Sequence, residues 1–186
     1  AIDWMEATIK TAVVEINDLY SKYRLNEALM AIFKLFTDEF SGWYLEMIKP
    51  AYQAPIDKKT LEATLNFFEQ LMKIIHPFMP FITEELYQHI AERAGDDSIM
   101  VSTLILNAPT EADKALMAQV EETKQIISGV RAVRQSKNIS PREPLSLEIV
   151  LSTDADRNVT HNEALCSVIK KMAGLSDIVY VEHKGD

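Results

Sequence analysis

A proline-bounded corner between two apolar helices constrains the fold more than any other stretch; it reads FFEQLMKIIHPFMPFITEELYQHI and spans Phe67–Ile90. Pro77 and Pro80 each lack an amide proton, and each disfavours helical torsions in the residue before it. One helix therefore ends near Pro77 and a second begins at Pro80, because proline suits the first turn of a helix. The corner is strongly apolar, so we expect it to lie at the centre of a helical core with Phe78, Met79, Phe81 and Ile82.

Apolar residues recur at three- to four-residue spacing on both sides of this corner, which predicts a bundle of helices. The predicted helices cover about residues 2–23, 25–49, 61–75, 82–93 and 111–137. Gly42 lies inside the second of them at a cost of about 1 kcal/mol relative to alanine, which indicates a close contact with another helix. Asp57 or Thr60 is placed to cap the third helix. Residues 99–106 are short, apolar and β-branched, and we expect an extended connector there.

Beyond Pro144 the period of the apolar residues changes from helical to alternating. Residues 145–151 alternate apolar and polar side chains, which predicts a half-buried strand, and 177–181 predict a second strand. The order strand, helix, strand implies a small parallel pair with a right-handed crossover. Because two strands alone are marginally stable, this part needs support from the bundle or from sequence outside the chain.

The helix between the two strands has sequence signals at both of its ends. It is predicted over about residues 162–172, with Thr160 and Glu163 spaced as a capping box and Gly174 as the C-cap. The predicted fold is therefore mainly α. A helical bundle over residues 1–144 is followed by a small strand–helix–strand appendage over 145–186, packed on the bundle.

Composition restricts the classes of function. The 186 residues, 47% of them hydrophobic, suffice for a real core, and the formal charge of −9 argues against coating nucleic acid by bulk electrostatics. A local basic patch remains compatible with that charge. The lone Cys166 excludes an internal disulfide framework and suits a reducing compartment. Without a signal sequence, a long apolar run or a lipidation motif, we expect a soluble cytoplasmic protein with no membrane contact.

The chain shows no pattern typical of catalysis, such as a Gly-rich phosphate loop, a nucleophile elbow or HExxH. Its histidines are scattered, so no metal site is predicted. His76 and His89 could meet across the corner, but a hydrogen-bonded structural role is more typical of a histidine at a helix end. Glu84 and Glu85 are interpreted as carboxylates in the first turn of a helix, where the dipole favours them. The Trp43–Tyr44 pair and the phenylalanines before it are interpreted as core rather than as a base-stacking platform.

The most informative charges lie on the helix predicted over 111–137. At about 100° per residue, Arg134 falls within the apolar face, where an unpaired charge is costly to bury. Either this end of the helix projects beyond the bundle, or Arg134 pairs with a carboxylate such as Glu84 or Glu85. The first alternative leaves a compact basic patch suited to phosphates, formed by Arg131, Arg134, Lys137 and Arg142.

Three segments occur in a characteristic order: GWYLEMIKP at Gly42–Pro50, IHPFMPFITEELYQ at Ile75–Gln88, and VRAVRQSKNISP at Val130–Pro141. With YRLNEALMAIF at Tyr23–Phe33, they resemble the anticodon-binding region of the valyl-tRNA synthetase family over nearly the whole chain.

The related families differ from this chain at particular positions. The isoleucine enzymes favour aspartate at the positions of Glu46 and Pro50, and the leucine enzymes favour histidine at the position of Phe81. The resemblance therefore favours valine.

The resemblance implies a helical bundle that docks the anticodon stem-loop of valine tRNA, while charging takes place on a separate catalytic domain. The nucleotide-binding motifs of that domain are absent here. We therefore expect a non-catalytic fragment without a cofactor, whose parent chain would use ATP and magnesium. Implied partners are valine tRNA and the catalytic and editing domains of the same chain. In the family, an upstream helix supplies some anticodon contacts and a coiled-coil arm follows. Because Ala1 is not an initiator methionine, we expect a piece of a longer protein.

The residues predicted to contact the RNA backbone are Arg131, Arg134, Lys137 and Arg142, with Lys22 and Arg24 as further candidates at a helix corner. Two alternatives to this function remain. One is the anticodon-binding domain of another class I synthetase, specific for isoleucine, leucine or methionine. The other is a helical protein-interaction scaffold that binds through its acidic surface.

Overall fold

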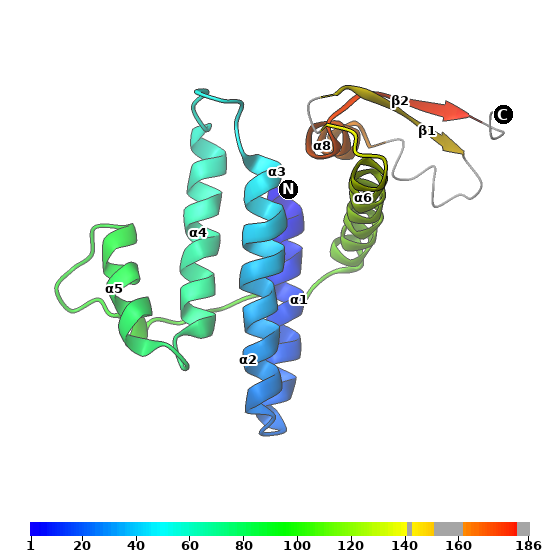
Figure 1. The fold of residues 1–186 in the computed structure, drawn as a ribbon. Coiled ribbons are helices and arrows are strands. Elements are labelled where there is room, and N and C mark those ends of the chain that lie inside the picture. The colour runs from blue at the N-terminus through cyan, green and yellow to red at the C-terminus, as the bar shows by residue number, and fades with distance from the viewer. Residues whose placement is uncertain (141–142, 151–161, 182–186) are drawn as a thin grey trace. The chain divides into compact units, whose positions relative to one another are not determined.

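The computed structural model describes residues 1–140, 143–150 and 162–181. The chain divides into two compact units, Ala1–Asp113 and Lys114–Asp186, whose elements are drawn in Figure 1. This division falls near the start of the long helix α6 (Glu111–Ser136). The domain boundary predicted near Pro144 stays a prediction. The predicted packing of the appendage on the bundle stays a prediction.

The N-terminal unit begins with two helices joined by a tight turn, α1 (Ile2–Ser21) and α2 (Leu25–Lys34). The turn is closed by Tyr23, which takes a φ of 56°, and by the Arg24 amide, which donates to the Leu19 carbonyl at 2.9 Å. The helix that begins with α2 continues through the π-helix η1 (Leu35–Tyr44) into α3 (Leu45–Ile48). The long helix predicted over 25–49 is therefore confirmed, with a π-helical middle.

The π-helix explains Gly42. A Cβ atom at this position would lie 3.2 Å from the carbonyl oxygen of Thr37, five residues earlier in the same helix, and among the described residues no atom of another helix lies within 4 Å of it. The expected close contact with another helix is therefore wrong. Glycine is suited to this position because the wider turn of the π-helix brings the Thr37 carbonyl close to it, and glycine has no Cβ atom to collide with that carbonyl.

Asp57 is the N-cap of helix α4 (Lys58–Ile75), and its Oδ1 accepts a hydrogen bond from the Thr60 amide at 2.9 Å. Of the two predicted capping residues, Asp57 is therefore confirmed. Beside α4, Tyr44 is fully buried. The Tyr44 ring centroid lies 5.6 Å from that of Phe40 and 5.5 Å from that of Phe67. The interpretation of Tyr44 as a core residue is confirmed.

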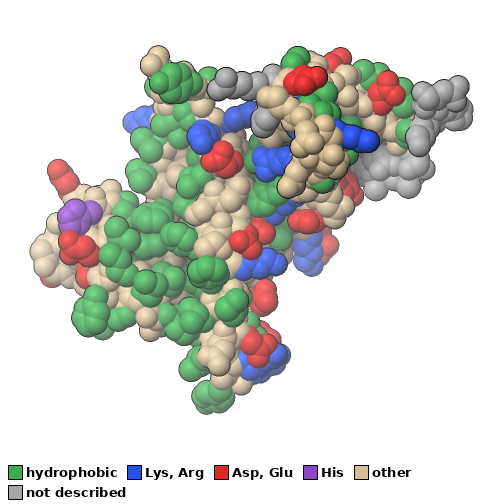
Figure 2. Space-filling view, in the orientation of Figure 1, with side chains coloured by type: hydrophobic (Ala, Val, Ile, Leu, Met, Phe, Trp, Pro, Cys, Tyr) green, Lys and Arg blue, Asp and Glu red, His purple; other side chains and the backbone are tan. Residues whose placement is uncertain are grey.

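The proline corner leads into α5 (Pro80–Ile90), but its apolar apex does not lie in the core. Phe81 is 90% exposed, and about half of the surface of Met79 and Ile82 is exposed. The buried side of α5 is instead formed by Thr83 and Tyr87, four residues apart. The predicted burial of the corner is therefore wrong, because this short helix turns another side toward α4. Figure 2 shows hydrophobic side chains gathered on the surface over α2, α4 and α5.

Hydrogen bonds stabilise the corner from inside. The Nδ1 atom of His76 lies 2.6 Å from the Thr83 hydroxyl, which also donates to the Met79 carbonyl. His76 therefore has the structural role expected of a helix-end histidine. His89 is exposed, and its Nδ1 lies 2.7 Å from the carbonyl of Glu85 on its own helix, so the two histidines have separate partners.

Helix α5 ends at Ile90, three residues before the predicted end near residue 93, and Arg93 follows in the next segment. Its guanidinium lies 3.3 Å above the Tyr87 ring centroid, donates to the Tyr87 carbonyl at 2.8 Å, and forms an ion pair with Glu69 of α4 at 2.7 Å. These contacts satisfy a carbonyl near the helix end and attach α5 to α4.

The sequence placed Glu84 in the first turn of a helix, but the structure has it in the second turn of α5. Its carboxylate accepts hydrogen bonds from the Ser98 hydroxyl at 2.6 Å and the Ile99 amide at 3.2 Å. It thereby holds the start of η2 (Ile99–Val101), a 3-10 turn within the segment predicted to be extended. These bonds give Glu84 a structural role, although the physical reason differs from the expected helix dipole.

The C-terminal unit contains most of α6, two parallel strands, β1 (Leu145–Val150) and β2 (Leu175–Val181), and α8 (Glu163–Ala173) between them. In the strand register Leu147 is opposite Ile178. Ile178, Leu165 and Ile169 are buried. The predicted strand–helix–strand order and parallel pairing are confirmed. The crossover includes residues 151–161, outside the described part of the chain, so its handedness stays a prediction.

The N-terminal end of α8 is capped differently from the prediction. The side chain of Asn162 accepts a hydrogen bond from the Leu165 amide at 3.3 Å, and Thr160 lies outside the described residues. Within the described ranges, no helix is long and apolar enough to span a membrane. The same residues contain no group of three or more His, Cys, Asp or Glu side chains that could hold a metal ion.

Candidate nucleic-acid interface

The candidate interface in the C-terminal unit starts at the end of α6, which the chain leaves through a left-handed residue. Asn138 takes a φ of 54°, and the Ile139 amide donates to the Arg134 carbonyl at 2.9 Å. Asparagine tolerates this conformation at a helix C-terminus. The chain therefore reverses direction after Asn138, close to the predicted helix end near residue 137, and the reversal brings the following carbonyls back toward α6.

A second left-handed residue ends α8. Gly174 has a φ of 68° and a ψ of 40°, which confirms the predicted C-cap. The last carbonyls of a helix have no partner inside the helix. At α8 these carbonyls belong to Met172, Ala173 and Gly174, and they accept hydrogen bonds from arginines of α6.

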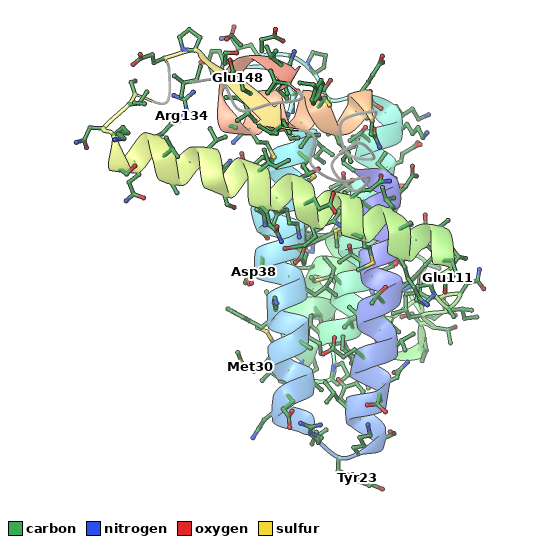
Figure 3. The ribbon with its side chains drawn as sticks, turned by 90° about the vertical axis from the view of Figure 1, so that its right-hand side faces the viewer. Tyr23, Met30, Asp38, Glu111, Arg134 and Glu148 are labelled. Carbon is green, nitrogen blue, oxygen red and sulfur yellow. The ribbon has the colours of Figure 1, made fainter. Side chains whose placement is uncertain are left out.

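Arg134 connects the two helix ends. Only 6% of its surface is exposed, and its Nε and Nη2 atoms donate to the carbonyls of Ala173 at 3.1 Å and Gly174 at 2.7 Å. Its Nη1 and Nη2 atoms donate to the carbonyls of Ser140 at 2.8 Å and Glu143 at 3.0 Å. Figure 3 shows Arg134 near the C-terminal end of α6.

These contacts differ from both alternatives that the sequence left open for Arg134. The side chain neither projects into solvent nor pairs with Glu84 or Glu85; four backbone carbonyls satisfy it. Neutral dipoles can stabilise a buried guanidinium when several point at it in the correct geometry. These bonds also explain why α6 groups with α8 and the strands, since they join its end to theirs.

Arg131 lies one turn before Arg134 and is exposed. Its Nε and Nη2 atoms donate to the Met172 carbonyl at 3.3 Å and 3.0 Å. Two guanidinium groups thus lie at the C-terminal end of α8, where the helix dipole favours positive charge.

A groove of about 810 Å³ lies between the end of α6 and the end of α8. Its charged lining residues are Arg131, Arg134 and Lys171, and none of the described residues that line it is an aspartate or glutamate. Gln135 and Asn138 add side-chain amides to the lining, and Ser140 adds a hydroxyl. The groove therefore presents cationic and hydrogen-bonding groups, which suit an anionic ligand.

The structure brings together only some of the predicted residues of this patch. Arg131 and Arg134 line the groove, whereas Lys137 is exposed just beyond α6 and does not line it. Arg142 lies outside the described residues. Lys171 was not predicted, although it belongs to a pair of lysines in the last turn of α8. Such a pair is also typical of an ordinary helix C-terminus, so the sequence alone did not single it out.

The other two predicted residues, Lys22 and Arg24, lie in the N-terminal unit, on either side of Tyr23. Each has an acidic neighbour: Lys22 Nζ lies 2.6 Å from an Asp18 oxygen, and Arg24 pairs with Glu27. Tyr23 is 89% exposed at the tip of the turn between α1 and α2, as Figure 3 shows. The turn thus presents an aromatic ring between two cations. Contacts with single-stranded bases commonly use such rings.

Comparisons with known proteins show similarity to one domain family and to one class of tRNA ligase. The family described as "Anticodon-binding domain of tRNA ligase" has a model that matches residues 3–150. A valine–tRNA ligase of Phocaeicola vulgatus is 48% identical over 186 residues, which is 100% of this chain and 20% of that protein. A valine–tRNA ligase of Parabacteroides distasonis is 48% identical over 184 residues, with 99% and 20% covered. That of Fusobacterium nucleatum is 29% identical over 181 residues, with 94% and 20% covered. The chain therefore spans about one fifth of the length of these relatives.

Proposed function

Because the chain belongs to the family of anticodon-binding domains of tRNA ligases, we propose that it binds the anticodon stem-loop of valine tRNA as part of a longer valine–tRNA ligase. The observation that carries this proposal is the family match over residues 3–150, together with the similarity of the whole chain to valine–tRNA ligases. Binding here holds the tRNA so that its acceptor end reaches a catalytic domain elsewhere in the same protein.

The chemical step is assigned to that other domain. Activation of valine would use ATP and magnesium there, and an editing domain of the same protein would be a further partner. The part played by this chain is positional, because holding a substrate in the correct orientation removes much of the entropic cost of the reaction step.

The residues assigned to RNA binding follow from exposure and charge. Arg131 and Lys137 are exposed cations at the end of α6 and are proposed to contact phosphates. Arg142 remains a further candidate from the sequence. Arg134 is assigned a positioning role, because its guanidinium is buried among carbonyls.

The turn at Tyr23 is proposed as a second contact. An exposed tyrosine ring can stack on an unpaired base, and Lys22 and Arg24 beside it can approach the adjoining phosphates. Their ion pairs with Asp18 and Glu27 are exposed. Exposed ion pairs contribute little free energy, so breaking them to bind RNA costs little.

A gel-shift titration with valine tRNA at low and moderate salt tests the proposal. We expect binding at low salt, with an affinity that falls as salt rises, because phosphate contacts release counterions. Isoleucine, leucine and methionine tRNAs serve as competitors, and preferential binding of one of them would favour the corresponding synthetase. Absence of binding at low salt, also for a chain extended by the preceding helix of its parent, would favour the protein-interaction scaffold.

A further inference from the structure

The groove at the end of α6 has a second wall, the last turn of α8, that lies beyond residue 150, where the family match ends. We propose that this groove binds phosphates of the RNA backbone and that Lys171 of α8 is one of its contact residues. The strand–helix–strand part of the chain then forms part of the RNA-binding surface. This inference rests on the proposed function, since it assigns RNA to the groove.

The charge of the groove supports an anionic ligand. Three cationic side chains line it, and two of them, Arg131 and Arg134, lie against the carbonyl end of α8. A helix C-terminus carries roughly half a negative charge, which two guanidinium groups exceed. The described lining thus carries three cationic side chains and no carboxylate, although the whole chain has a net charge of −9.

The neighbouring lysine shows that the position of Lys171 is specific. Lys170 forms an ion pair with Asp177 of β2, with 2.8 Å between Nζ and Oδ1, and does not line the groove. Lys171 follows it in the same helical turn and is exposed on the groove side. Of these two lysines, Lys171 is the one that lines the groove.

The uncharged lining residues indicate which part of RNA the groove suits. Gln135 and Asn138 are exposed amides that can bind phosphate oxygens and ribose hydroxyls. Among the described lining residues there is no aromatic ring on which a base could stack. We therefore expect contacts with the backbone that fix the orientation of the RNA and do not read its sequence.

The inference is tested by Lys171→Gln, with Lys59→Gln as the matched control, since Lys59 is an exposed lysine of α4 in the other unit. Affinity for a fluorescent RNA hairpin with the valine anticodon loop is measured over a series of salt concentrations. Lys171→Gln should weaken binding by about two- to fivefold at low salt and reduce the salt slope by about one. The control should bind like the unaltered chain.

A hairpin with a changed anticodon adds a second readout. Because a phosphate contact does not read bases, Lys171→Gln should weaken both hairpins by the same factor. Equal affinities and slopes for Lys171→Gln and Lys59→Gln would overturn the assignment of the groove and leave the proposed function standing. Failure of the unaltered chain to bind either hairpin would contradict the proposed function itself. A loss confined to the valine hairpin would show base recognition and overturn the phosphate assignment.

Discussion

At the scale of single residues, Arg134 decides how the C-terminal unit is held together. Its guanidinium reaches two carbonyls at the end of α8 and two in the segment after α6. Because its planar donors point in several fixed directions at once, arginine can bind all four, whereas lysine has a single charged nitrogen.

We predict that Arg134→Met destabilises the C-terminal unit by about 3 kcal/mol, because it removes the donor from four buried or partly buried hydrogen bonds. Hydrogen–deuterium exchange of residues 163–181 measures the effect, since both tryptophans, Trp4 and Trp43, lie in the other unit. Arg134→Lys should recover only part of the loss.

Arg131→Met is the control for this prediction, because Arg131 is exposed and its described bonds reach one carbonyl. It should increase exchange less than Arg134→Met does. Exchange in Arg134→Met as slow as in the unaltered chain would show that the four hydrogen bonds contribute no net stability.

At the scale of elements, the proline corner separates apolar character from burial. Pro77 and Pro80 determine where α4 ends and α5 begins, but the orientation of α5 about its own axis decides which side chains are covered. Thr83 and Tyr87 are buried and Phe81 is exposed, although phenylalanine is the more hydrophobic residue. The hydrogen bond between Thr83 and His76 makes this orientation acceptable, because it satisfies a buried hydroxyl.

The corner gives a prediction with a matched pair of variants. Phe67→Ala should cost about 3–5 kcal/mol of unfolding free energy, because Phe67 is 3% exposed and its removal leaves a cavity. Phe81→Ala should change that free energy by less than about 0.5 kcal/mol, because the side chain already faces solvent. Urea unfolding followed by tryptophan fluorescence measures both. Equal losses for the two variants would contradict the structure of the corner.

At the scale of the whole molecule, hydrogen-bonded carboxylates link stability to pH. Hydrogen bonds from Thr60, Ser98, Thr110 and Lys170 lower the pKa of four carboxyls, those of Asp57, Glu84, Asp113 and Asp177. Burial by itself raises the pKa of Glu69, but its hydrogen bonds with Lys73 and Arg93 outweigh burial and leave that pKa below its usual value. The folded chain therefore binds fewer protons than the unfolded chain in mildly acidic solution.

The sign of the pH dependence follows from these lowered pKa values. Their stabilisation is fully present above the unfolded values, about 4.3 for glutamate and 3.9 for aspartate, and is lost as pH falls through the folded values. We predict that titration of these carboxyls changes the urea midpoint of unfolding little between pH 7 and about 5.5 and lowers it below about pH 4.5.

Glu69→Gln should weaken this acid dependence, because it removes one of the carboxyls with a lowered pKa. Glu62→Gln, on the exposed side of the same helix, is the control and should leave the dependence nearly as it is. A midpoint that stays constant down to pH 3 would contradict the prediction.

The sequence by itself determined the approximate places of the helices, the cap at Gly174, the parallel strand pair and the family, and it restricted the cap of α4 to Asp57 or Thr60. Each of these depends on residues within a few positions of one another or on motif order, and such local signals do not need the fold. Gly42 shows the limit of such local signals, because a glycine inside a helical pattern does not distinguish a π-helix from a close contact between helices.

The tertiary structure alone decided the side of α5 that is buried, the partners of Arg134 and the place of Lys171 in the groove. Arg134 binds carbonyls 39 and 40 residues away in the sequence. No periodicity or spacing encodes such a partner, because a backbone carbonyl is present at every residue and only packing selects which one an arginine meets.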